Sequence, residues 1–158
     1  MKYRVLSDQE LKELEGEFKH FLITNNIYTE EWVELNKTKD KKVIELVEMF
    51  SDIVLDKALK NIKYLEHVTP HDIKSFWCED EKMTLIGVTS KNKEIDFTKH
   101  TLADFSADLD IFKTSKNYYK ERELEVFELL NSGCSIIDEE RFNKLNMAYN
   151  YSTKKIKN

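Results

Sequence analysis

The longest uninterrupted helical pattern in the chain runs from about Asp40 to Asn61. Apolar side chains recur in it at three- and four-residue steps, namely at Val43, Leu46, Val47, Phe50, Ile53, Val54 and Ala58. This spacing places them along one face of a helix, and no glycine or proline interrupts it. We therefore expect a long helix here at the centre of the core.

Further helices are expected on both sides of this pattern. Residues Ser7 to Glu10 match a capping box, so a helix should begin there and continue to about Thr24. Thr29 can cap a second, short helix. Other helical patterns are expected in these places: Leu102 to Phe112, Asn117 to Asn131 with a stop at Ser132 and Gly133, and from Asp138 onward with Asp138 as the cap.

The region between these helices mixes extended and helical signals. Three segments are rich in residues that favour strands: Tyr64–Val68, Met83–Thr89 and Glu94–Thr98. Thr69 and Pro70 are instead typical of a helix start, and that short helix would carry Ile73, Phe76 and Trp77.

These patterns predict an α+β fold. It is mostly helical, with a small two- or three-stranded antiparallel sheet packed against the long helix. Residues 1–150 are expected to form a single globular domain, because 158 residues with 41% hydrophobic content can close one core. Residues 151–158 are expected to form a basic, flexible tail.

Composition excludes several classes of function. The net charge is -5, and only three of the 25 basic residues are arginine, so sequence-specific DNA binding is disfavoured. The three glycines are isolated, which excludes glycine-rich phosphate loops. No apolar run is long enough to span a membrane, and no signal peptide is expected. The two cysteines have no CxxC partner and are predicted to be reduced thiols in the cytoplasm.

Two histidines and a cysteine are crowded between Tyr64 and Val88. His67 and His71 have the spacing of paired metal ligands on a helix, but Pro70 would interrupt that helix. Cys78 precedes three acidic residues, which disfavour a reactive thiolate. We therefore expect no catalytic thiol, metal site or cofactor here, although the sequence leaves open whether these side chains meet in space.

A second candidate for metal binding is acidic. Asp104 and Asp108 lie one helical turn apart and, with Asp110, resemble the carboxylate clusters that bind magnesium. The amphipathic pattern favours a solvated helix face instead. Whether these aspartates bind a cation stays open at this point.

Aromatic and basic residues are the candidates for contacts with a partner. They lie in the middle and at the end of the chain: Phe76, Trp77, Tyr149, Tyr151, Lys154 and Lys155. The C-terminal group could stack on bases or dock on an acidic partner.

No nucleophile, base and orienting group can be assembled from the sequence, so it favours a non-catalytic role over an enzyme. We expect an intracellular adaptor or regulator that binds another protein through a helical face or around Phe76 and Trp77. One alternative is an RNA- or ribosome-associated factor that uses the lysines and the C-terminal tail. The other is a metal-dependent enzyme that uses the histidines or the aspartates.

Two stretches, MKYRVLSDQELKELEGEFKHFLITNNIYTEEW and EMFSDIVLDKALKNIKYLEHV, resemble a small family of uncharacterised proteins from Bacteroidota. The resemblance covers roughly the first ninety residues, and the shared motifs look like packing patterns. It implies a cytoplasmic bacterial protein and transfers no catalytic residue.

Overall fold

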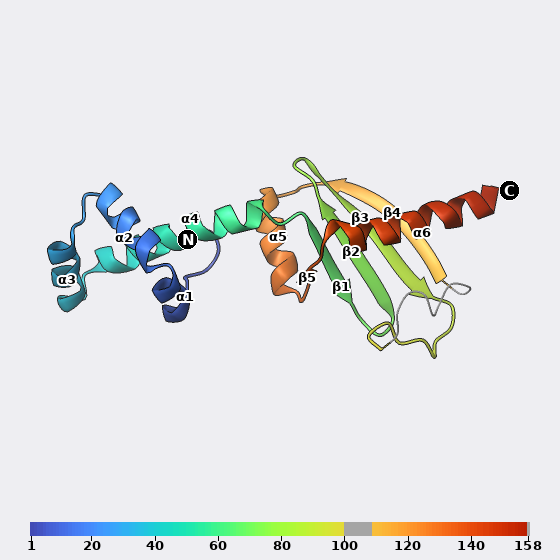
Figure 1. The fold of residues 1–158 in the computed structure, drawn as a ribbon, viewed down its shortest axis with the longest axis horizontal. Coiled ribbons are helices and arrows are strands. Elements are labelled where there is room, and N and C mark those ends of the chain that lie inside the picture. The colour runs from blue at the N-terminus through green and yellow to red at the C-terminus, as the bar shows by residue number, and fades with distance from the viewer. Residues whose placement is uncertain (100–108, 158) are drawn as a thin grey trace. The chain divides into compact units, whose positions relative to one another are not determined.

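The computed structural model describes residues 1–99 and 109–157, with side chains as far as Lys154. This part of the chain has an α+β fold with six helices and five strands (Figure 1). Contacts divide the chain into two compact units, Met1–Leu59 and Lys60–Asn158. Among the described helices, none combines the length and the apolar character needed to cross a membrane.

The first unit is helical. Its helices are α1 (Asp8–Glu13), α2 (Glu15–Thr24), α3 (Thr29–Lys37) and α4 (Lys41–Lys60), which crosses the boundary by one residue. The capping box at the start of α1 is confirmed, because the amide of Glu10 donates to Ser7 Oγ and the amide of Ser7 donates to Glu10 Oε2. Arg4 also donates to the Glu10 carboxylate, and these bonds lower the pKa of Glu10 to about 2.

Two details of the predicted helices are wrong. The helix expected from Ser7 to Thr24 is divided at Leu14, whose backbone leaves the helical region with φ -103° and ψ 22°. Thr29 does not cap α3 but is its first helical residue. The N-cap is the preceding residue, Tyr28, whose backbone is extended. The long helix α4 is confirmed within one residue at each end.

The core of the first unit forms where α2 and α3 meet α4. Leu22, Ile27 and Leu46 are buried together there. The Phe18 ring lies 5.2 Å from the Trp32 ring and 4.9 Å from the Phe50 ring, centroid to centroid. These contacts bury Leu46 and Phe50 of the predicted apolar face of α4, whereas Ile53 of the same face is 55% exposed.

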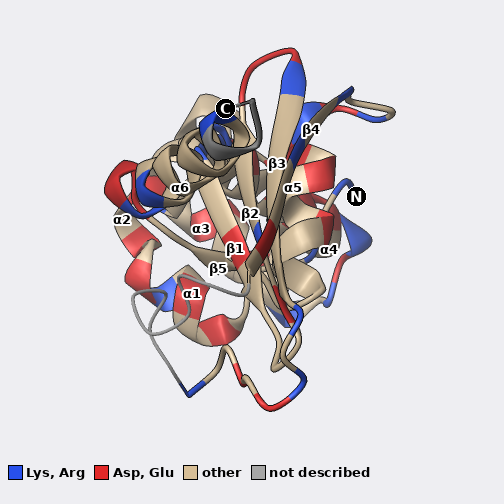
Figure 2. Cartoon of the chain, turned by 90° about the vertical axis from the view of Figure 1, so that its right-hand side faces the viewer, with Lys and Arg blue, Asp and Glu red and all other residues tan. Residues whose placement is uncertain are grey.

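The second unit contains an antiparallel sheet and two helices. The strands are β1 (Tyr64–Val68), β2 (Asp72–Cys78), β3 (Lys82–Ser90), β4 (Leu109–Asn117) and β5 (Ser135–Ile136), in the order β4-β3-β2-β1-β5. The helices are α5 (Arg122–Asn131) and α6 (Glu139–Lys157). Figure 2 shows α5 and α6 on opposite sides of the strands. The sheet is therefore larger than the two or three strands expected.

The helix expected after Thr69 is a strand instead. The amide of Thr69 donates to the Asp72 carbonyl at 2.9 Å, so Pro70 and His71 form the tip of the β1–β2 hairpin. Proline is favoured both at the first position of a helix and at the second position of a β-turn, because both require φ near -65°. The Thr69 hydroxyl accepts from the amides of His71 and Asp72 and thus caps a turn.

Two other predicted elements differ from the structure. Glu94–Thr98 forms turns and irregular backbone rather than a strand. Leu109 and Phe112, expected in a helix, belong to β4, whose pairing with β3 replaces the helical hydrogen bonds. The preceding part of that predicted helix lies outside the described residues.

Within the second unit, α6 packs on the sheet. Phe142 and Leu145 of α6 join Ile73, Ile86 and Val88 in one buried cluster. Asp138 Oδ1 accepts from the amide of Arg141 at 2.8 Å, which confirms the predicted cap. The helix continues through residues 151–157, so the segment expected to form a tail is helical in the structure; its flexibility stays a prediction.

Candidate functional site

A hollow lies on the face of the sheet that α6 covers. Strand pairing places Trp77 beside Thr84 and Thr84 beside Ser115, so these three side chains form a row across β2, β3 and β4. The hollow has a volume of about 280 Å³. It is lined by Trp77, Glu79, Lys82, Thr84, Lys113, Thr114, Ser115 and, from α6, Tyr149.

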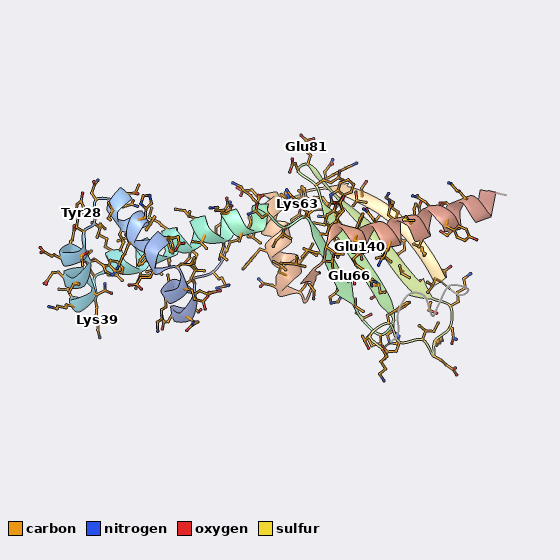
Figure 3. All side chains as sticks on the ribbon, viewed as in Figure 1. Tyr28, Lys39, Lys63, Glu66, Glu81 and Glu140 are labelled. Atoms are coloured by element: carbon orange, nitrogen blue, oxygen red, sulfur yellow. The ribbon has the colours of Figure 1, made fainter. Side chains whose placement is uncertain are left out.

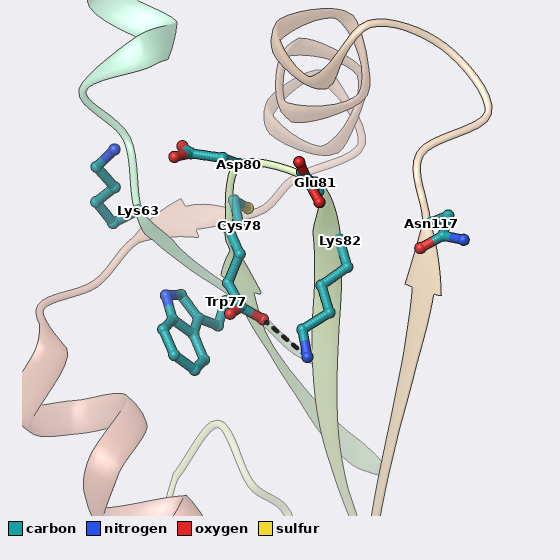
Figure 4. A pocket seen from close by; sticks show the side chains of 8 residues that line it. Lys63, Trp77, Cys78, Asp80, Glu81, Lys82 and Asn117 are labelled. Atoms are coloured by element: carbon teal, nitrogen blue, oxygen red, sulfur yellow. Dashed lines mark ion pairs between the residues drawn. The ribbon is translucent and has the colours of Figure 1, made fainter.

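A second hollow adjoins the first at the tip of the β2–β3 hairpin (Figure 4). Its volume is about 520 Å³, and it is lined by Lys63, Trp77, Cys78, Glu79, Asp80, Glu81, Lys82 and Asn117. Both hollows share Trp77, Glu79 and Lys82. We call the two together the Trp77 groove.

Trp77 is held in place while part of it stays accessible. Its ring lies 6.1 Å from those of Tyr64 and Phe142, and 37% of its surface is exposed. Phe142 is itself buried. An aromatic ring with one packed side and one accessible side is a common anchor for a partner, because little conformational entropy is lost on binding.

Hydrogen bonds from Arg122 fix the backbone beneath the groove. This buried side chain donates to the carbonyls of Ile62, Cys78 and Glu79. The Tyr118 hydroxyl also donates to the Glu79 carbonyl, at 2.6 Å. Because β2 ends here, these bonds set the position of the hairpin that carries Trp77 and Lys82.

A partly buried ion pair connects β1 to α6. Glu66 Oε2 accepts from Arg141 Nε at 3.1 Å, and Glu66 Oε1 accepts from Arg141 Nη2 at 3.2 Å. The Ser75 hydroxyl also donates to Glu66 Oε2, at 2.8 Å. Figure 3 shows Glu66 on β1, beside the first part of α6 where Glu140 is labelled. This network holds the start of α6 on the sheet.

Charges of both signs meet in the groove. Lys82 Nζ lies 4.0 Å from Glu79 Oε2, as the dashed line in Figure 4 marks. Lys113 Nζ donates to Asn146 Oδ1 at 2.9 Å and lies 5.9 Å from the centre of the Tyr149 ring. No carboxylate of the described residues forms an ion pair with Lys113. Figure 2 shows blue and red segments intermixed on the chain.

The groove borders the edge of the sheet. β4 is nine residues long, and β3 is the one described strand that pairs with it. At the other edge, β5 has two residues. The backbone along the outer side of β4 can therefore pair with a further strand.

The structure brings together two of the six predicted contact residues. Trp77 and Tyr149 line the same hollow. Phe76 points to the opposite face, where it lines a separate pocket of about 350 Å³ with Met83 and Leu129. Exposed Tyr151 and Lys154 are not among the residues that line the groove, and the side chain of Lys155 lies outside the described part.

The sequence analysis missed Lys82, Thr84, Lys113 and Ser115. Their place in the site depends on strand register, which joins residues of different strands. Residues 83–89 were expected to form a strand, so the period of two along a strand was a usable signal for the face of Thr84. No such signal was available for β4 because it was expected to be helical.

The candidate metal ligands do not form a site in the described residues. His67 lies in β1 and His71 at the hairpin tip, so the shared helical face that their spacing suggested does not exist. No group of three or more His, Cys, Asp or Glu side chains in residues 1–99 and 109–154 could hold a metal ion. Asp104 and Asp108 lie outside the described part, and Asp110 pairs with Lys91 at 3.5 Å.

Cys78 is a buried thiol and is expected to be unreactive. Burial, partly offset by the Arg122 charge, raises the pKa of this thiol from 9.0 to about 11. We expect iodoacetamide to label Cys78 of the folded protein at least about a hundredfold more slowly than a free thiol near pH 8. Mass spectrometry of timed samples measures this rate, and the urea-unfolded chain is the control.

The same shift has a consequence for stability. The folded state binds the Cys78 proton more tightly than the unfolded state does, and this difference contributes to the free energy of unfolding. The contribution is complete below pH 9 and is lost as the pH rises toward 11. A Cys78→Ala variant should lose less stability over this pH interval.

In the labelling experiment, rapid reaction of the folded protein near pH 8 would contradict the burial of the Cys78 thiol.

Comparison with known protein families shows to which family the chain belongs. A model of a family of unknown function, DUF6495, matches residues 1–150. The chain belongs to this family. The match confirms the resemblance to an uncharacterised family and extends it over both units, while the bacterial origin stays a prediction. No curated protein and no solved structure matches the chain.

Proposed function

We propose that this DUF6495 member is a non-catalytic binding module that takes up an extended segment of another protein along β4. One observation carries the proposal: a nine-residue edge strand borders a groove with accessible aromatic rings. In strand addition, main-chain hydrogen bonds supply affinity and adjacent pockets select side chains. Lys113 and Ser115 of β4 line the groove, so a strand added there would project side chains toward it.

The charges in the groove support a protein partner over RNA. The larger hollow is lined by three carboxylates, those of Glu79, Asp80 and Glu81, and by two lysines, Lys63 and Lys82, so it offers no net positive charge to phosphates. Two of the three arginines, Arg122 and Arg141, are engaged inside the protein. We place the module in the cytoplasm, a compartment that the free thiols of Cys78 and Cys134 support.

Random peptides displayed on phage test this proposal. We expect selected peptides to bind the wild-type protein and to bind Trp77→Ala and Ser115→Arg about tenfold or more weakly. Trp77→Ala removes the anchor, whereas Ser115→Arg fills the hollow and leaves the packing of Trp77 on Tyr64 and Phe142 intact. Fluorescence polarisation measures the affinities.

The matched control is Tyr119→Ala, which removes an aromatic ring that is 87% exposed and does not line the groove. It should bind the same peptides as the wild type. Hydrogen exchange should also show slower exchange of β4 amides in the complex. Peptides that bind all three variants equally, or salt-sensitive binding of RNA in their place, would contradict the proposal.

A further inference from the structure

We infer that the segment bound along β4 carries an acidic side chain opposite Lys113 and an apolar side chain two residues away, opposite Ser115. This inference rests on the proposed function and names the class of segment that the site selects. It follows from the charge on β4, from strand register and from the shape of the groove.

Lys113 is the charged residue of β4 that lacks an ionic partner among the described residues. Asp110 pairs with Lys91, and Lys116 pairs with Glu125. The ammonium of Lys113 instead contacts the neutral amide of Asn146 and the ring of Tyr149. It lies in the middle of the strand, on the face of the groove. A carboxylate directly across from it would complete an ion pair for which the described residues supply no partner.

The same lysine argues against a second copy of this chain as the occupant. Antiparallel pairing of two β4 strands centred on Lys113 would place two ammonium groups directly opposite each other. Such like-charged pairs destabilise a sheet, and a lysine within an edge strand is a common means of preventing self-association. The charge is complementary to an acidic segment and repels another β4 in this register.

Register determines where the neighbouring side chain of the segment lies. Side chains two residues apart on a strand share a face, so the residue opposite Ser115 points to the same side as the acidic one. Ser115 follows Trp77 and Thr84 in the row across the sheet. An apolar side chain there borders the part of the hollow that Ser115 and Tyr149 line. In an antiparallel segment this residue precedes the acidic one, which gives the order apolar, any residue, acidic.

A designed peptide tests the inference directly. The probe is a fluorescein-labelled peptide as long as β4, made of threonine and valine, with leucine two residues before a central glutamate. We expect replacement of the glutamate by lysine to weaken binding about tenfold. Lys113→Glu should weaken binding of the glutamate peptide to a similar extent and should restore binding of the lysine peptide. Replacement of the leucine by serine should weaken binding to both proteins.

Lys116→Gln is the matched control for Lys113→Gln, because both residues lie on β4 but Lys116 points to the opposite face. Only the change at Lys113 should reduce the preference for glutamate over lysine. An unchanged preference in Lys113→Glu would overturn the inference.

Backbone contacts separate this outcome from a failure of the proposed function. Slower exchange of β4 amides, together with loss of binding on N-methylation of alternate peptide amides, would support strand addition whatever the peptide's charge. If the β4 amides are protected but the charge swap has no effect, the proposed function stands and the inference fails. If none of these peptides protects β4, both are overturned.

Discussion

Replacing Arg122 with alanine is expected to destabilise the second unit by about 3 kcal/mol. The side chain is 7% exposed, and it donates to three carbonyl groups from two separate segments of the chain. Without it, the carbonyls of Ile62, Cys78 and Glu79 lose a charged donor, and an unsatisfied buried acceptor costs more than its hydrogen bond contributed. Glu123, which lies 3.4 Å from the guanidinium, would also lose its counter-charge.

Urea unfolding followed by tryptophan fluorescence measures this effect in the relevant unit. The chain has one tryptophan in each unit, Trp32 and Trp77, so a Trp32→Phe background restricts the signal to the second unit. Lys120→Ala is the control, because its ion pair with Glu128 is half exposed and should contribute less than about 1 kcal/mol. Equal effects of the two substitutions would show that Arg122 does not hold the hairpin.

Replacing Arg141 with alanine is the second change with a large expected effect, a loss of about 2 kcal/mol. It leaves the carboxylate of Glu66, whose side chain is 8% exposed, with the Ser75 hydroxyl as its remaining side-chain donor among the described residues. Much of the loss is the cost of a buried charge without a counter-charge. The loss is smaller than for a fully buried pair because the Arg141 side chain is 35% exposed and solvent screens the pair.

A double variant distinguishes the cost of leaving the Glu66 charge unpaired from a simple loss of contacts. Glu66→Met combined with Arg141→Met removes both charges and keeps similar side-chain volumes, so we expect it to recover most of the stability lost in Arg141→Ala. Lys144→Ala, which affects an exposed pair with Glu140, should change stability little. A double variant that is less stable than Arg141→Ala would mean that the ion pair is itself strongly stabilising.

The helices of the first unit were largely predictable because their apolar residues follow one period. α4 buries part of one face, and the spacing of Leu46 and Phe50 on it reports directly on that burial. The break at Leu14 was not predictable, because Leu14 itself keeps helical hydrogen bonds. The Leu14 amide donates to the Glu10 carbonyl, and the Leu14 carbonyl accepts from the Phe18 amide.

Strand β2 was missed because both of its faces are covered. Ile73 and Trp77 point toward α6, while Phe76 and Cys78 point toward the face of α5, so apolar residues do not alternate with polar ones. Together, Ile73, Phe76 and Trp77 reproduce the three- and four-residue steps of a helix. Trp77 was predicted as a candidate contact residue from its type alone, whereas the residues beside it in the groove follow from tertiary pairing.

The inequality of the two sheet edges limits how copies of this protein can assemble. A copy that used its β4 to dock on the β5 of another would find two residues to pair with, too few for a stable ladder. Head-to-tail stacking, the route by which open edges generate filaments, is thus disfavoured at one end. A complex formed on β4 should end after a single addition, with one guest strand for each host.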